Sequence, residues 1–134
     1  MLKIVIAVVL LAHGIGHSMG LLQMLRIVTV NPVWRGDSWL VTGPFGTTAT
    51  QLVGASLWIV AIVGFAGVAS AVVGWIPASL FTPLAIASSA VSLAGIALFP
   101  VAFPTFSTIG ALVVDVAVLI IVTWFHWVPS DLAA

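Results

Sequence analysis

The chain has 134 residues, of which 63% are hydrophobic and 4% are charged, and its formal net charge is zero. Because a soluble domain needs a far more polar surface, this composition predicts an integral membrane protein that has the lipid bilayer as a partner. The few basic residues form no patch for nucleic acid, and the lack of cysteine excludes disulfides, thiolate catalysis and iron–sulfur ligands.

Four apolar stretches reach the length of about 20 residues with which a helix crosses the hydrocarbon core of a bilayer. They span residues 2–28, 48–73, 78–99 and 108–128. The connections between the last three are short and contain proline, which favours neighbouring helices that run in opposite directions. The sequence therefore predicts an all-α fold, a single-domain antiparallel bundle of four transmembrane helices, in a multi-pass protein of a bacterial-type cytoplasmic membrane.

The first stretch carries two histidines one helical turn apart, His13 and His17, inside an almost unbroken apolar run. Ionisable side chains inside a bilayer are costly and usually face a partner, a cavity or a ligand. Gly16 and Gly20 share the face of these histidines, and small residues at this spacing let another helix approach closely. We therefore expect the histidine face to be packed against other helices.

The connection at residues 29–47 holds Trp34 and Trp39 beside an arginine and an aspartate. Indole rings are common where a membrane meets water, so this connection is predicted to be an interfacial cap. The alternative is a lid over a site. In that case the two tryptophans would stand at the mouth of the site together with Gln51, near the start of the second stretch.

The fourth stretch carries Asp115, the other ionisable group that lies well inside a predicted span. At 1.5 Å of rise per residue, Asp115 lies roughly 10 Å below the boundary near Thr108, and His17 lies roughly 13 Å below the same boundary, which the first stretch meets near Arg26. These depths predict that His17 meets Asp115, with Ser92 of the third stretch in the same layer and His13 one turn deeper.

Three interpretations of this group are open from the sequence. The first is a structural hydrogen bond between His17 and Asp115 that fixes the register of the helices. The second is a site for a divalent metal with His13, His17 and Asp115 as ligands. The third is a metal-free pocket for a lipophilic molecule, in which His17 and Asp115 are the candidate catalytic residues: His17 exchanges a proton and Asp115 orients it. In that pocket the ligand would be contacted by His13, Gln51, Ser92, Trp34 and Trp39.

The segment Leu11-Ala12-His13-Gly14-Ile15-Gly16-His17, the tryptophan-containing connection and the three further spans with short links resemble small DoxX-like four-helix membrane proteins. The resemblance covers the whole chain in layout. It implies a link to membrane redox chemistry with quinones or sulfur compounds, and hence a quinone-like lipophile as the ligand.

The leading functional hypothesis is a small membrane protein whose His/His/Asp site binds a lipophilic molecule or a metal as a component of an oxidoreductase. The alternative is a noncatalytic accessory subunit or an oligomeric packing protein. In that case the small-residue faces would recruit further copies of the chain or a larger membrane complex.

Overall fold

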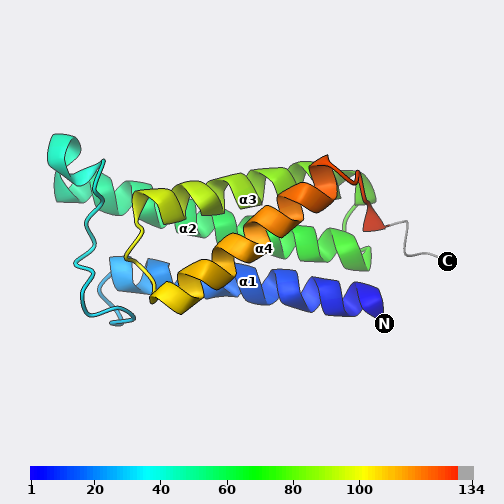
Figure 1. Ribbon diagram of the computed structural model, residues 1–134, viewed down its shortest axis with the longest axis horizontal. Coiled ribbons are helices and arrows are strands. Elements are labelled where there is room, and N and C mark those ends of the chain that lie inside the picture. The colour runs from blue at the N-terminus through cyan, green and yellow to red at the C-terminus, as the bar shows by residue number, and fades with distance from the viewer. Residues whose placement is uncertain (130–134) are drawn as a thin grey trace.

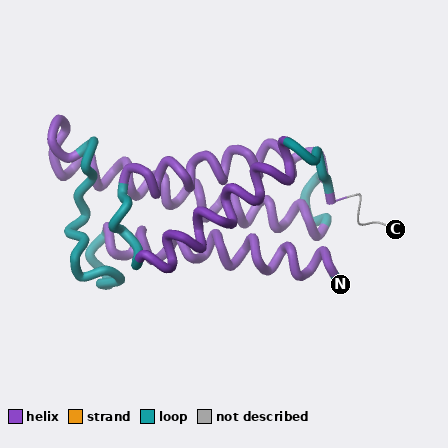
Figure 2. Tube along the Cα trace, in the orientation of Figure 1, coloured by secondary structure: helices purple, strands orange, loops and turns teal. Residues whose placement is uncertain are grey.

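The computed structural model describes residues 1–129, so Asp131 lies outside the described part of the chain. The described part is helical and contains no strand (Figure 2). Its elements are the helices α1 (Leu2–Met24), α2 (Thr42–Val73), α3 (Phe81–Leu98) and α4 (Thr105–Thr123), with a 3-10 turn, η1 (Ala78–Leu80), directly before α3. With η1 counted as part of α3, these four helices are long and apolar enough to span a membrane.

The helices lie side by side, and α4 runs diagonally across the others (Figure 1). α1 packs on α2, α2 packs on α3, and α3 packs on α4. Because α4 is inclined, it makes far fewer contacts with α1 than with α3. The connections at residues 25–41 and 99–104 lie at one end of the molecule, while Met1 and the connection from α2 to α3 lie at the other (Figure 1).

The first two helices differ from their predicted bounds at the end that carries the long connection. α1 ends at Met24 rather than near residue 28, because the side chain of Gln23 holds the backbone that follows. α2 begins at Thr42, before the predicted residue 48. Gly46 has φ +77° and ψ 177°, however, so the first turn of α2, before Gly46, is separated from the regular helix that follows. The turn belongs to the connection more than to the span.

α4 also begins and ends earlier than predicted. It starts at Thr105 instead of residue 108, directly after Pro104, whose ring fixes φ and whose missing N–H is not needed at a helix start. It ends at Thr123 instead of residue 128, and His126 beyond it has φ +50°. These shifts of about one turn change which residues of α1 and α4 lie at the same depth.

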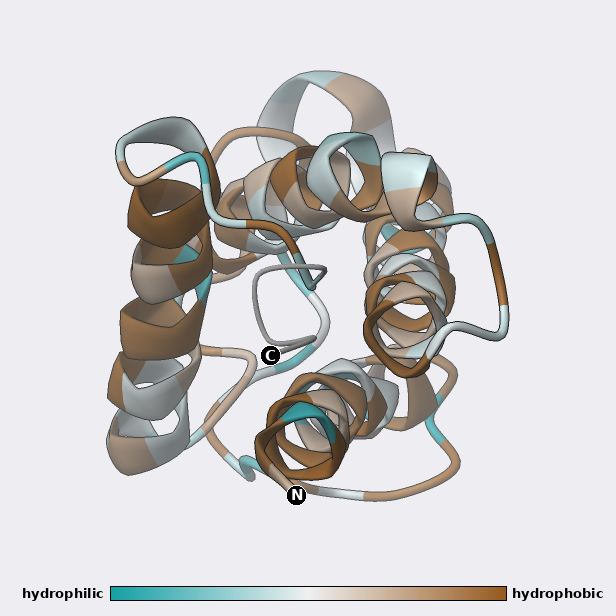
Figure 3. Ribbon diagram, turned by 90° about the vertical axis from the view of Figure 1, so that its right-hand side faces the viewer, coloured by the Kyte–Doolittle hydropathy of each residue, from teal (hydrophilic) through white to brown (hydrophobic). Residues whose placement is uncertain are grey.

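The interior consists of two apolar clusters with a polar layer between them. The cluster toward Met1 includes Leu10, Phe65, Val68, Phe81, Ala85 and Val122. The cluster toward the long connection includes Met24, Trp34, Trp58, Ile96, Phe99 and Phe103. Apolar residues recur along the helices (Figure 3), and many large apolar side chains are exposed on the outside of the molecule. The polar groups of the interior therefore lie between two apolar clusters.

Candidate functional site

The centre of the polar layer is Asp115 on α4, whose side chain is completely buried. One carboxylate oxygen, Oδ1, lies 2.9 Å from Nε2 of His13 on α1. The other, Oδ2, accepts a hydrogen bond of 2.5 Å from the hydroxyl of Ser92 on α3. Asp115 thus joins three helices, and both of its oxygens have partners, which is what a buried carboxylate requires.

His17 joins the same network through Ser92. Its side chain is buried, with 2% of the residue exposed, and its Nε2 lies 3.0 Å from Oγ of Ser92. The prediction that His17 meets Asp115 directly, with His13 a turn too deep, is wrong: His13 makes the direct contact and His17 is linked through the serine.

The bounds of the helices explain why His13, and not His17, contacts Asp115 directly. Asp115 lies ten residues after Thr105, where α4 begins, and His13 lies eleven residues before Met24, where α1 ends. At 1.5 Å per residue these separations are about 15 and about 16 Å. His17 is about 10 Å from the same end of α1, so it lies one turn short of the carboxylate, at a gap that Ser92 bridges.

Which atom donates in each hydrogen bond of the network follows from the hydrogen atoms that are available. Ser92 has one hydroxyl hydrogen, and it is donated to Asp115, so Nε2–H of His17 must donate to Oγ of Ser92. As a carboxylate, Asp115 accepts only, and Nε2–H of His13 must donate to it. Each neutral imidazole then carries its unprotonated acceptor at Nδ1. Within residues 1–129, neither Nδ1 atom has a hydrogen-bond partner.

Aromatic rings hold both imidazoles in place. The ring of Phe65 meets His13 edge to face, with centroids 4.5 Å apart, and the ring of Trp58 stacks on His17 at 5.5 Å with an angle of 12°. Phe103 meets His17 edge to face at 6.2 Å and also contacts the ring of Trp58. With their rotamers fixed in this way, the two histidines keep their Nδ1 atoms in a constant direction.

The glycines of α1 fall into two kinds. A Cβ atom at Gly14 would lie 2.8 Å from Cβ of Phe65, and one at Gly20 would lie 2.6 Å from Cζ of Phe103, so both positions are closely packed. A Cβ at Gly16 would have no atom within 4 Å. The expectation that Gly16 and Gly20 form one packed pair is therefore half wrong, and the packed glycines are Gly14 and Gly20.

A cavity of about 120 Å³ lies beside the histidines, between α1 and the first two turns of α4. Its lining residues are His13, Gly16, His17, Phe103, Ser107 and Ala111. An engineered apolar cavity of about 150 Å³ is known to hold benzene, so this space suits a single ring or a few water molecules. Ser107 and Phe103 could not be predicted as site residues from the sequence, because their part in the site depends on the tilt of α4.

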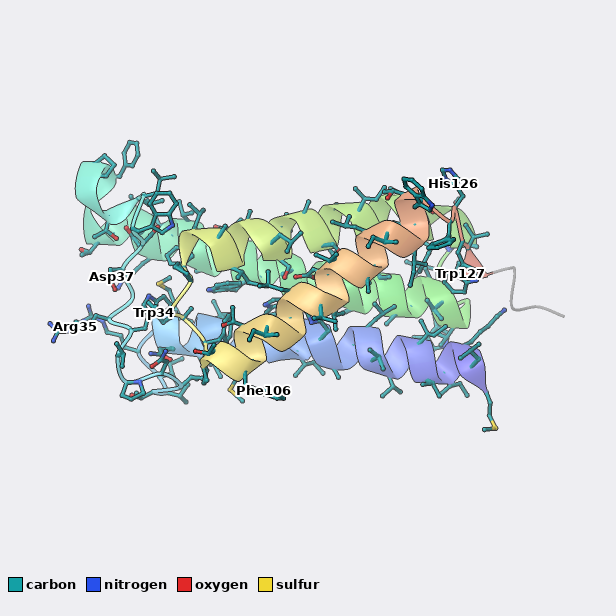
Figure 4. The ribbon with its side chains drawn as sticks, viewed as in Figure 1. Trp34, Arg35, Asp37, Phe106, His126 and Trp127 are labelled. Atoms are coloured by element: carbon teal, nitrogen blue, oxygen red, sulfur yellow. The ribbon has the colours of Figure 1, made fainter. Side chains whose placement is uncertain are left out.

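The other residues predicted to bind a ligand lie away from this cavity. Trp34 is buried and donates from Nε1 to the carbonyl of Asp37, while Trp39 is exposed and donates to the carbonyl of Ala97. Gln51 is half-buried near the start of α2. None of the three lines the cavity. Figure 4 shows Trp34 and Asp37 at the end of the molecule opposite His126.

The long connection is held as a cap by Gln23. Its Oε1 accepts from the N–H groups of Val30 and Asn31, at 2.8 Å each, and its Nε2 donates to the carbonyls of Asn31 and Trp34. Asn31 in turn donates to the carbonyl of Val101 in the connection before α4. These bonds tie the connection to the end of the helices.

The donors of the site do not converge on a point where a metal would sit. Among residues 1–129, no group of three or more histidine, aspartate or glutamate side chains is placed to hold a metal ion. Nε2 of His13 is directed at Asp115, and Nε2 of His17 is directed at Ser92. Of the interpretations open from the sequence, the geometry favours those without a metal.

Comparison with known proteins finds no family model, no curated protein and no solved structure that matches this chain. The resemblance to DoxX-like proteins therefore stays an expectation from the sequence. The features of the molecule that bear on its function are the hydrogen-bond network, the cavity beside it and the apolar helices around them.

Proposed function

We propose that this chain is a multi-pass integral membrane protein, an antiparallel bundle of four transmembrane helices that binds a lipophilic molecule at the network of His13, His17, Ser92 and Asp115. Large apolar side chains exposed along α4, such as Ile109, Val113 and Ile120, support a lipid surrounding, since water would disfavour them. The ligand in this proposal carries a hydroxyl group on a single ring, as an alkylphenol or a quinol does.

The observation that carries the proposal is that Nε2 of each imidazole faces a partner within the protein, Asp115 for His13 and Ser92 for His17. Both imidazoles donate from Nε2 into the protein, so each has an acceptor, Nδ1, without a partner in residues 1–129. A ligand that brings a donor can bond to an acceptor that the protein itself leaves without a partner. Since both histidines line the cavity, a hydroxyl group fits this site better than a ketone or an ester, which only accept.

The proposed reaction is the transfer of one proton. The O–H bond of the ligand breaks, an N–H bond forms at Nδ1 of His17, and the ligand becomes an oxyanion. The positive charge on the imidazole is stabilised by Asp115, which His17 reaches through Ser92. His13, bonded directly to Asp115, offers a second acceptor of the same kind. In an oxidoreductase, this site would take the protons of a quinol while a partner subunit takes the electrons.

The chain has three histidines, so nitrogen-15 labelling of the imidazoles gives a spectrum that single variants can assign. In lipid nanodiscs, we expect His13 and His17 to carry their proton on Nε2. Adding 4-octylphenol should then shift the Nδ1 resonances of these two residues and leave those of His126 unchanged, because His126 lies at the far end of α4 (Figure 4).

The matched control is 4-octylanisole, in which a methyl group replaces the hydroxyl hydrogen. Losing one good hydrogen bond should weaken binding about tenfold, which corresponds to about 1.4 kcal/mol. Equal affinity for the two compounds would contradict the proposal, as would shifts confined to His126.

A further inference from the structure

Gly16 is a glycine that neither packing nor backbone conformation explains. It lies inside a regular helix, where glycine is less favourable than alanine, and its φ is not in the left-handed region. Gly14 and Gly20 on the same helix leave room for aromatic rings, but no atom lies within 4 Å of where a side chain at Gly16 would begin. The space that this residue leaves belongs to the cavity beside the histidines.

The wall opposite Gly16 is also made of small residues. It is formed by Ser107, which is exposed, and Ala111, which is half-buried, on the first two turns of α4. Gly16 is exposed as well. Since α4 makes few contacts with α1, the seam between these two helices is open at this level rather than filled by interlocking side chains. The cavity therefore reaches the outer surface of the molecule between α1 and α4.

The position of this opening along the helices suits a molecule with a polar head and an apolar tail. Ser107 is two residues after the start of α4, about 3 Å along the helix, so the opening begins near the end of the molecule that carries the cap. The histidines lie two to three turns deeper on α1. Gly16 lies on α1 between His17 and His13 and is exposed, so a headgroup that enters sideways between the helices passes Gly16 on its way to the imidazoles.

We infer that the ligand of the proposed site enters sideways from the bilayer between α1 and α4, through the space left open at Gly16, and that the size of the cavity limits its headgroup to one ring. The inference rests on the proposed function, and it adds the route and the size class of the ligand. The alkyl tail stays outside, between the lipid chains. A head of two fused rings exceeds a cavity of about 120 Å³, since about 150 Å³ holds one benzene molecule.

The test replaces Gly16 by leucine, which fills the opening without meeting another residue. Gly110 offers a matched control, because it too is a helical glycine with no atom within 4 Å of a Cβ, yet it does not line the cavity. We expect Gly16→Leu to weaken the binding of 4-octylphenol at least tenfold with the melting temperature kept or raised. Gly110→Leu should change neither quantity, and Gly16→Ala should have an intermediate effect.

A second measurement does not depend on the leucine variant being folded. The natural chain has no cysteine, so Gly16→Cys and Gly110→Cys each carry a single thiol. We expect 4-octylphenol to slow the reaction of N-ethylmaleimide with Gly16→Cys at least threefold and to leave Gly110→Cys unaffected. An octyl-substituted naphthol should protect neither thiol.

The outcomes separate this inference from the function on which it rests. If the unaltered chain does not bind 4-octylphenol, the proposed function fails and the inference fails with it. If the unaltered chain binds the phenol and shifts both histidines, but Gly16→Leu binds it equally well, the site stands and the route past Gly16 is wrong. Equal binding of the naphthol would overturn the size limit alone.

Discussion

Asp115 owes its position in the core to groups on other helices. Removing one partner of a buried carboxylate costs more than the pair contributes, because the remaining group is left without water and without a partner. Ser92 is the most consequential of these partners, since its hydroxyl both donates to Asp115 and accepts from His17. The loss of this one oxygen leaves two buried polar atoms unpaired.

Ser92→Ala should therefore lower the free energy of unfolding by roughly 1–3 kcal/mol, measured in mixed micelles with increasing sodium dodecyl sulfate. Ser89, which is also completely buried on α3, is the control, because its hydroxyl has no hydrogen-bond partner in the described chain. Ser89→Ala should leave the stability unchanged or raise it. A similar loss in both variants would show that the hydroxyl of Ser92 does not hold the network together.

At the scale of the helices, the end of α1 is set by Gln23, whose amide replaces the backbone partners that the chain lacks after the last turn. The face of the same helix is shaped by its glycines, two of which leave room for neighbouring rings while the third leaves an open space. Sequence spacing alone does not separate these cases, because both kinds of glycine recur at helical intervals.

Gly14→Ala is expected to destabilise the protein by roughly 1–3 kcal/mol, because its Cβ meets Cβ of Phe65 and, at 3.4 Å, the carbonyl oxygen of Ile62, neither of which is the free end of a side chain. Gly16→Ala should be neutral or stabilise by up to about 1 kcal/mol, as alanine favours the helix. Thermal unfolding of the two variants in one detergent makes the comparison. The reverse order of stability would contradict the packing described for α1.

Gln23→Ala should loosen the connection at residues 25–41, since four hydrogen bonds are lost together. Limited proteolysis in detergent is expected to cut this connection several times faster in the variant. Gln51→Ala is the control, because Gln51 forms no side-chain hydrogen bond within the described residues. Equal cutting of the two variants would mean that the cap does not depend on Gln23.

For the molecule as a whole, the four apolar helices and their apolar outward surface are what a bilayer requires. In the proposed arrangement, the connection after α1 and the connection between α2 and α3 face opposite sides of the membrane. The near balance of basic residues between the two ends leaves the direction of insertion open. The alternation of sides can be measured without knowing that direction.

Single cysteines at Thr29, in the first connection, and at Ser79, in η1, provide this measurement, because both positions are exposed and the chain has no other thiol. In sealed vesicles of uniform orientation, a membrane-impermeant maleimide should label one of Thr29→Cys and Ser79→Cys and not the other. Both should react after the vesicles are permeabilised. Labelling of both in sealed vesicles would contradict a membrane-spanning antiparallel bundle.

The sequence predicted the helices and the members of the polar network better than their contacts. Apolar length located four helices, and the high cost of polar groups among apolar residues singled out His13, His17, Ser92 and Asp115. The direct partner of Asp115 was wrong because helix ends shifted by about three residues move a side chain by a full turn. The cavity could not be predicted, since it depends on the inclination of α4, which no local pattern of residues encodes.

The bonds of Asp115 have a consequence for the order in which the chain is made. An aspartate at the centre of an isolated transmembrane helix opposes insertion by about 2.5–3.5 kcal/mol. α4 is synthesised last, when His13 on α1 and Ser92 on α3 have already left the ribosome. In the proposed transmembrane bundle, the fourth helix therefore meets partners that are already present, whereas a chain that began with α4 would have to hold its carboxylate in lipid until they arrived.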